Sequence, residues 1–113
     1  MACPFFEPKE VLAKDWGLHR PRTPLGQVYS GRCHAGDDYL PSERELIDWC
    51  NWGYARGACP RFPESAPADA LRFSINADGV VAMVAELEFA PVPHATLDQR
   101  CIDAQHRAFQ QNH

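Results

Sequence analysis

The chain has 113 residues, of which 45% are hydrophobic, and its formal net charge is -4. This length suits one domain with a single core, and the hydrophobic fraction excludes a disordered chain. The sequence lacks the basic runs of nucleic-acid-binding proteins, the roughly 20 apolar residues of a membrane helix, and the basic and apolar segments of a secretion signal.

The first part of the chain, residues 1–67, holds eight of the ten prolines and four of the five cysteines. Stretches such as HRPRTPLGQVYSGRCHAGDDYLPS have no sustained hydrophobic period and contain many turn-forming residues. We therefore expect 1–67 to be a cysteine-rich loop region with one helix and few backbone hydrogen-bond ladders. The whole chain, 1–113, should form one cytoplasmic α+β domain.

The expected helix begins at Ser42, which forms a capping-box pattern with Glu45. Gly53 or Gly57 could end it in the left-handed conformation. A helix that continued to Gly57 would carry Cys59 a turn or more away from the earlier cysteine, so a shared site favours the earlier end. The apolar side of this helix comprises Leu46, Ile47, Trp49 and Cys50.

The segment 68–113 is more regular. LRFSINADGVVAMVAELEFA predicts a β-hairpin whose turn, 76–79, is of type I, with Gly79 at positive φ forming a G1 bulge. This loop length places Phe73 opposite Met83 and Ile75 opposite Val81. The opposite, solvated face should carry Arg72, Ser74, Glu86 and Glu88.

After the breaker PVPH, Thr96 and Gln99 form a second capping-box pattern, which predicts a helix to about residue 110. An isolated hairpin is marginally stable in water, so we expect this helix and aromatic residues of 1–67 to cover the apolar face of the hairpin. The apolar stripe of the helix comprises Leu97, Cys101, Ala104, Ala108 and Phe109.

Five cysteines are many for a short cytosolic chain, and an odd number cannot pair completely into disulfides. Ala2-Cys3-Pro4 is repeated as Ala58-Cys59-Pro60, with phenylalanine three residues after each cysteine. Proline fixes the chain beside the sulfur and also follows the last cysteine of the bacterial ferredoxin run. However, the chain has no C-x2-C pair, so no standard zinc or ferredoxin spacing is matched.

Four thiolates could nevertheless bind one metal centre and staple the loop region, because a small domain with little core commonly needs such a staple. The proposed ligands are Cys3, Cys33, Cys50 and Cys59. Near them lie three arginines that could offset the negative charge of a cluster, Arg32, Arg56 and Arg61. The aromatic residues that could exclude water are Phe5, Phe6, Trp49, Trp52, Tyr54 and Phe62.

The motifs ACPFFEP, YSGRC and CNWGYARGACPRFP resemble the dispersed-cysteine motifs of small, uncharacterised bacterial proteins thought to hold a [4Fe-4S] cluster. The resemblance covers about the first 63 residues. It implies cluster ligands at Cys3, Cys33, Cys50 and Cys59, and it leaves Cys101 outside the set.

The sequence leaves other readings open. All five cysteines could be core residues, since free cysteine is commonly buried; we accept this for Cys101, which could still replace one ligand. Cys33 with His34, Asp37 and Asp38 could be a catalytic set, although adjacent side chains rarely face each other as such chemistry requires. The remaining histidines are scattered, and Glu86 with Glu88 fits a solvated strand face better than an acid/base pair.

The sequence therefore predicts an iron–sulfur protein, with [4Fe-4S] as the favoured cofactor and zinc as the alternative. Its role would be electron transfer or redox sensing through a protein partner, with membrane and nucleic acid as unlikely partners. Four thiolates leave no open iron position, which disfavours an enzyme. The alternatives are a zinc-stapled interaction module and a metal-free thiol enzyme.

Overall fold

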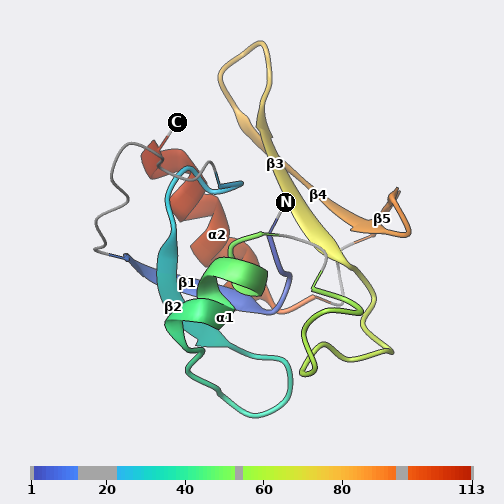
Figure 1. Ribbon diagram of the computed structural model, residues 1–113. Helices are drawn as coiled ribbons and strands as arrows, with labels where there is room; N and C mark the ends of the chain where they lie inside the picture. The colour runs from blue at the N-terminus through green and yellow to red at the C-terminus, as the bar shows by residue number, and fades with distance from the viewer. Residues whose placement is uncertain (1, 13–22, 53–54, 94–96, 113) are drawn as a thin grey trace.

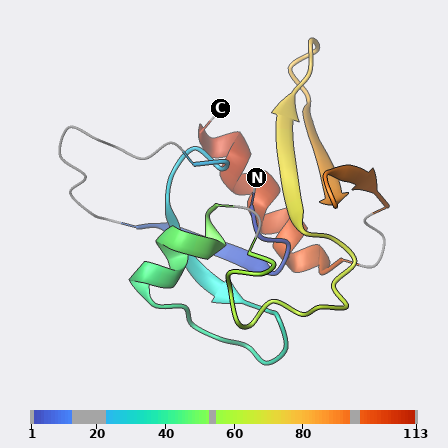
Figure 2. The same ribbon diagram turned by 45° about the vertical axis from the view of Figure 1, so that its right-hand side comes forward.

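The computed structural model describes residues 2–12, 23–52, 55–93 and 97–112. Strands β1 and β2 form one antiparallel pair, and β3, β4 and β5 form a second antiparallel sheet in that order. Helix α2 lies between the two sheets (Figures 1 and 2). The mixture of helix and strand confirms the α+β class. The elements are β1 (Phe6–Val11), β2 (Tyr29–Cys33), α1 (Glu43–Glu45), η1 (Leu46–Cys50), β3 (Ala70–Ile75), β4 (Val81–Leu87), β5 (Ala90–Val92) and α2 (Gln99–Asn112).

The N-terminal part of the chain is more regular than its composition indicates, so the expectation of few ladders there was wrong. Strands β1 and β2 pair from Phe6 opposite Cys33 onward, with a register shift just after Pro8. Pro8 lies opposite Gly31, where the strands approach so closely that a Cβ on Gly31 would stand 2.1 Å from the carbonyl oxygen of Glu7. The proline and the glycine that seemed to exclude strands are thus accommodated at an irregular step of the ladder.

Two isolated bridges join this small sheet to the rest of the chain. The Ala2 N–H donates to the Leu71 carbonyl at 2.9 Å, and the Leu71 N–H donates to the Ala2 carbonyl at 2.8 Å, so the N-terminus pairs with the outer edge of β3. Cys33 and Tyr39 exchange a second pair of backbone bonds, of 2.8 and 3.0 Å. The second bridge closes the loop after β2 and fixes the backbone of Cys33.

The helix in the N-terminal half begins as predicted and ends early. The capping box of Ser42 and Glu45 is present, with both reciprocal hydrogen bonds. The single turn α1 continues into the π-helical turn η1, and Asn51 caps its end. The earlier of the two predicted ends is therefore confirmed, although Gly53 itself lies outside the described residues. Gly57 has a φ of 84° but belongs to a later turn.

The β3–β4 hairpin has the predicted register. Phe73 lies opposite Met83, Ile75 lies opposite Val81, and Gly79 has a φ of 78°. The ring of Phe73 stacks on Phe109 of α2 at a centroid distance of 5.6 Å, so the helix covers the apolar face as expected. The tip of the hairpin extends beyond the body of the molecule (Figure 1).

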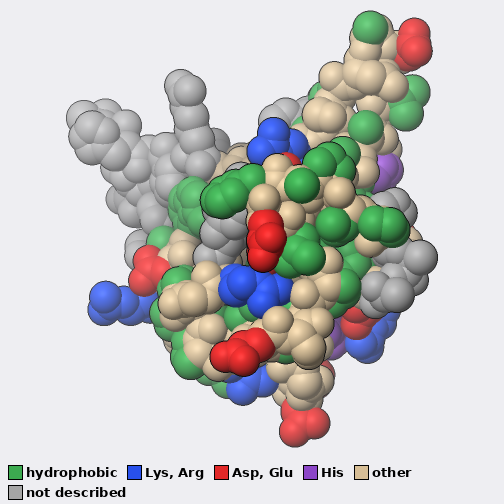
Figure 3. All heavy atoms as spheres, turned by 90° about the vertical axis from the view of Figure 1, so that its right-hand side faces the viewer, with side chains coloured by type: hydrophobic (Ala, Val, Ile, Leu, Met, Phe, Trp, Pro, Cys, Tyr) green, Lys and Arg blue, Asp and Glu red, His purple; other side chains and the backbone are tan. Residues whose placement is uncertain are grey.

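The polar face of the hairpin differs from the prediction at both glutamates. Glu86 is buried, and its carboxylate lies 3.4 Å from the Arg72 guanidinium, so it does not belong to a solvated face. Glu88 follows the end of β4 and lies in the turn before β5. Hydrophobic side chains gather on the surface of the side that carries β4 and β5 (Figure 3).

Helix α2 buries four residues of the predicted apolar stripe, together with Ile102 and Gln105. These four are Cys101, Ala104, Ala108 and Phe109, whereas Leu97 is buried just before the helix begins at Gln99. Thr96 of the predicted capping box lies outside the described residues. The Asp98 carboxylate accepts a hydrogen bond of 2.9 Å from the Arg100 backbone N–H and thereby caps the first turn. No helix among the described residues has the length and apolar character needed to cross a bilayer.

Candidate metal centre

The repeated Cys-Pro sequence forms the same β-turn twice. The Phe6 N–H donates to the Cys3 carbonyl at 3.1 Å, and the Phe62 N–H donates to the Cys59 carbonyl at 3.1 Å. Proline suits the second position of such a turn because its φ is already fixed. The two turns are also in contact, since the rings of Phe5 and Phe62 meet edge to face with centroids 5.5 Å apart. Residues at opposite ends of the loop region are therefore brought together in space.

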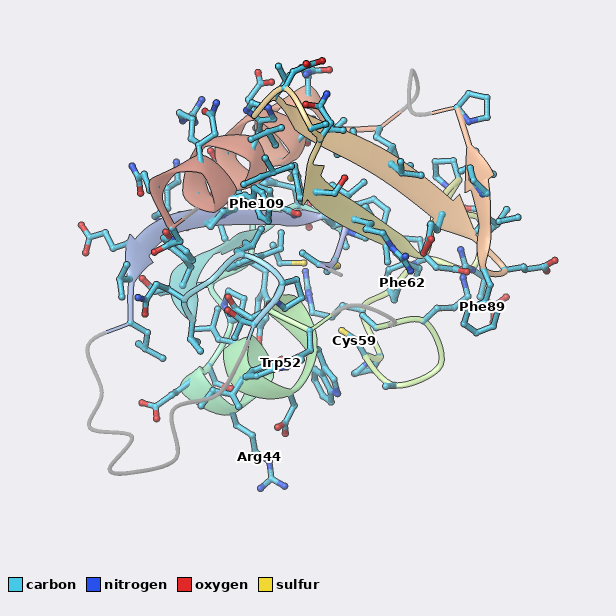
Figure 4. The ribbon with its side chains drawn as sticks, turned by 90° about the horizontal axis from the view of Figure 1, so that it is seen from above. Arg44, Trp52, Cys59, Phe62, Phe89 and Phe109 are labelled. Carbon is cyan, nitrogen blue, oxygen red and sulfur yellow. The ribbon has the colours of Figure 1, made fainter. Side chains whose placement is uncertain are left out.

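The other two predicted ligands lie at the ends of neighbouring elements. Cys33 is the last residue of β2, opposite the first residue of β1, and its Sγ accepts a hydrogen bond of 3.5 Å from the Ala35 N–H. Cys50 is the last residue of η1. Cys50 and Cys59 both pack against the buried cluster that contains Cys3. Figure 4 shows Cys59 between Trp52 and Phe62.

The acid–base properties of the thiols reflect this grouping. Burial raises the pKa of Cys3 to about 12; a hydrogen bond from the Phe5 backbone opposes the shift, and the sulfurs of Cys33 and Cys59 add to it. Burial also raises the pKa of Cys50, and Cys3, Cys33 and Cys59 reinforce that shift. Cys33 and Cys59 thus contribute to the raised pKa of both Cys3 and Cys50.

The four side chains do not yet form a coordination sphere. Within the described parts of the chain, no three His, Cys, Asp or Glu side chains stand where they could hold one metal ion. A bound metal would require the sulfurs to turn toward a common point.

Gln105 fixes the first Cys-Pro turn and was not singled out from the sequence. It is fully buried in α2, and its side-chain amide donates to the carbonyl of Cys3 at 2.7 Å and to that of Phe6 at 2.8 Å. It therefore binds both ends of the turn that carries Cys3. The only sequence signal is a polar residue beside Ala104 and Ala108 on the apolar side of the helix.

Asn51 plays a similar part beside Cys50. It is fully buried; its Oδ1 accepts from the Tyr29 N–H at 2.9 Å, and its Nδ2 donates to the Tyr29 carbonyl at 3.0 Å. The same Nδ2 donates to the Leu46 carbonyl at 2.9 Å. The side chain thus mimics a neighbouring strand and attaches the end of η1 to β2.

The three arginines near the cysteines have different roles. Arg32 makes an ion pair on the surface, where such pairs contribute little. Arg56 pairs with Asp69 and donates to the carbonyls of Glu64 and Ala66 at 2.8 and 2.9 Å, so it organises the loop after Cys59. Arg61 stacks 4.0 Å above the ring of Tyr39, and its buried Nε has no hydrogen-bond partner in the described residues. Of the three, Arg61 retains a buried donor for a further acceptor.

His34 is engaged away from the cysteine group. Its Nε2 lies 2.7 Å from the Glu7 carboxylate, and its Nδ1 lies 3.9 Å from that of Asp38. Hydrogen bonds from Lys9 and then from His34 lower the pKa of Glu7. A role for His34 as the base of a catalytic Cys33 receives no support from this orientation. His19, His94 and His113 lie outside the described residues.

Cys101 lies within α2. It is fully buried, and its pKa is raised by burial and then by Asp98 and Glu7, with Cys3 contributing less. The other three candidate ligands are not among the causes of that shift. Its surroundings fit a core residue of the α2 stripe.

Comparisons of the chain with protein-family models, with curated proteins and with solved structures find no match. Its chemistry is therefore inferred from its own side chains.

Proposed function

We propose that the protein binds one iron–sulfur cluster, [4Fe-4S], through Cys3, Cys33, Cys50 and Cys59. The observation that carries this proposal is the meeting of the two Cys-Pro turns, whose Phe5 and Phe62 rings are in contact. Thiolates are soft ligands suited to iron–sulfur clusters and to zinc. Cys3 and Cys50, whose raised pKa values include contributions from Cys33 and Cys59, belong to a donor set that a metal centre would stabilise.

The surroundings of the sulfurs favour a cluster. A cluster with four thiolates is negatively charged, and N–H groups directed at its sulfurs stabilise it and tune its potential. Ala35 already donates to Cys33 Sγ at 3.5 Å. Phe5 and Phe62 would limit the access of water from one side.

Such a centre would supply one-electron redox chemistry, and the residues named above would hold it. Because four thiolates occupy every iron, no position remains for a substrate. The role would therefore be electron transfer or redox sensing with a protein partner, rather than catalysis by this chain alone.

Two alternatives share the same residues. A zinc-stapled interaction module would use the same four thiolates, since zinc accepts four sulfur ligands. A metal-free thiol enzyme would need a reactive thiolate, and the raised pKa values of Cys3 and Cys50 disfavour both as nucleophiles at neutral pH.

Anaerobic reconstitution with iron and sulfide tests the proposal. We expect a brown protein with about four irons and four sulfides per chain, as the [4Fe-4S] stoichiometry requires, that bleaches in air. Single Cys→Ser variants at the four ligand positions should lose the iron. Cys101→Ser is the matched control and should retain it.

The alternatives give different results in the same experiment. A colourless protein that retains one zinc per chain would identify the interaction module. A protein that binds neither metal, with one cysteine alkylated much faster than the others, would identify the thiol enzyme. Loss of iron from Cys101→Ser, together with full retention by one of the four ligand variants, would overturn the proposed ligand set.

A further inference from the structure

A small cavity lies between β1 and α2. The Gln105 amide joins the two elements at the start of β1, where it donates to the Phe6 carbonyl at 2.8 Å. Further along both elements the cavity has a volume of about 160 Å³ and opens to solvent. Figure 4 shows α2 lying along β1. A cavity of about 150 Å³ can hold benzene, so this one has room for a small organic molecule. The polar side chains that line it belong to Glu7, Lys9, Tyr29, Arg107 and Gln111.

The charged groups of the cavity leave one positive charge uncompensated. The Glu7 carboxylate is held from two sides, with Lys9 Nζ 2.9 Å from one oxygen and His34 Nε2 2.7 Å from the other. Arg107 is exposed, and within the described residues no carboxylate lies within ion-pair distance of its guanidinium. Lys9 and Arg107 therefore bring two positive charges to the lining, against the one negative charge of Glu7.

The hydrogen-bonding capacity left in the cavity consists mainly of donors. The Tyr29 hydroxyl donates to the Ala108 carbonyl at 3.4 Å and accepts from Asn112 Nδ2 at 2.7 Å. Both oxygens of Glu7 already have partners. An ammonium group and a guanidinium group have donors only, three and five respectively. A molecule that fills the cavity should therefore be rich in acceptors and carry negative charge.

We propose that this cavity binds a small monocarboxylate with a polar body, such as a hydroxycarboxylate. The planar guanidinium of Arg107 would bind the carboxylate through two parallel hydrogen bonds, which is the geometry that arginine forms best with this group. The ammonium of Lys9 would add a second positive charge, and the Gln111 amide would bond to the hydroxyl. None of the four proposed metal ligands lines the cavity, so the inference is independent of the proposed metal centre.

The charge of the cavity selects among anions. One uncompensated positive charge matches a single negative charge. A phosphate dianion would bring a second negative charge close to Glu7, and this repulsion should weaken its binding. A neutral molecule of the same shape would leave the Arg107 guanidinium without a charged acceptor. We therefore expect lactate to bind, phosphate to bind more weakly, and lactamide, the neutral amide of lactate, not to bind.

NMR titration of the full-length, isotope-labelled protein with sodium lactate tests the proposal, with sodium chloride keeping the ionic strength constant. We expect saturable shifts of the Arg107 Nε–H and of the backbone amides of Lys9 and Gln111. Arg107→Gln should raise the dissociation constant of lactate by about tenfold or more, because it removes the charged, bidentate donor. The same spectra show whether the variant is folded.

Arg100→Gln is the matched control. Arg100 lies on the same helix outside the cavity, and its guanidinium is 2.8 Å from the Asp98 carboxylate, so its replacement should change the dissociation constant by less than about twofold. Shifts that do not saturate, or an unchanged affinity in Arg107→Gln, would overturn the site. Phosphate or lactamide that binds as tightly as lactate would overturn its assignment to a monocarboxylate.

Discussion

Each Cys-Pro turn is closed by its own backbone hydrogen bond, of the same type in both turns. The two turns differ in the groups that hold them in place. The turn at Cys3 lies in the core, with both of its ends bound by the buried amide of Gln105. The turn at Cys59 is partly exposed; the Cys59 N–H donates to the Ala55 carbonyl at 2.7 Å, and Arg56 organises the loop that follows. One turn is built into the fold, whereas the other belongs to a surface loop.

This difference indicates how a site without preformed geometry can still assemble. Cys3 and Cys33 have backbones fixed by long-range pairing, through Ala2 with Leu71 and through Cys33 with Phe6. The loop that carries Cys59 can shift at lower cost, because few buried groups depend on its position. In the proposed metal centre, the Cys59 loop would therefore be the part that adjusts its position.

Removal of the Gln105 clamp should have the largest effect on stability. Gln105→Leu keeps the approximate volume but leaves the carbonyls of Cys3 and Phe6 without their donor in the core. Each buried carbonyl left unsatisfied costs about 1–3 kcal/mol, so we expect the free energy of unfolding to fall by about 2–4 kcal/mol. Urea denaturation of the reduced, metal-free protein measures it.

Gln99→Leu on the same helix is the matched control. Gln99 is exposed and bonds only to Asp103 on the surface, so its replacement should change stability by less than about 0.5 kcal/mol. Equal losses from the two variants would show that the Cys3 turn does not depend on Gln105.

Loosening the second turn should cost less. Arg56→Met leaves the buried carboxylate of Asp69 unpaired and removes two bonds to the loop after Cys59. The Arg56 side chain is 32% exposed, so water would compensate in part and we expect a loss of about 1–2 kcal/mol. Alkylation followed by mass spectrometry should show faster modification of Cys59 and an unchanged rate at Cys3.

Arg44→Met provides the comparison for that variant, because Arg44 makes an exposed ion pair with Asp48. It should change neither stability nor alkylation. Faster alkylation of Cys3 than of Cys59 in Arg56→Met would reverse the assignment of the fixed and adjustable turns.

Short-range signals identified the parts of the fold that neighbouring residues determine. The capping box at Ser42 depends on a residue three positions away, and the hairpin register depends on the loop ending at Gly79. Both were predictable because the sequence pattern and the hydrogen bonds lie within a few residues. The proline repeat predicted a fixed chain beside Cys3 and Cys59, and the β-turns at both positions are a finding of the structure.

Long-range contacts were not predictable in this way. Strands β1 and β2 pair across a long connection, and Pro8 and Gly31 conceal them because both residues normally weaken strands. Gln105 bonds to residues about a hundred positions away, and Asn51 bonds to Tyr29 in another element. A polar side chain at a buried position is recognisable in sequence only when the buried face of its element is known. The group to which it hydrogen-bonds is not recognisable from the sequence.

Alkaline pH should lower the free energy of unfolding through the buried thiol of Cys3, by less than the losses predicted above. An unfolded chain loses the proton of a thiol near the ordinary pKa of 9.0, whereas burial raises the pKa of Cys3 to about 12 in the folded protein. Between these values the unfolded state binds fewer protons, so the stability contributed by the neutral thiol is complete below pH 9 and decreases as the pH rises toward 12. At about pH 10 the loss through Cys3 should be about 1 kcal/mol.

Urea denaturation of metal-free wild type and Cys3→Ala at about pH 8 and about pH 10 measures this loss, because the variant lacks this thiol and should lose less stability between the two conditions. Parallel losses in the two proteins would show that Cys3 is as accessible to water as an ordinary surface thiol, and the distinction between a buried and an exposed turn would fail.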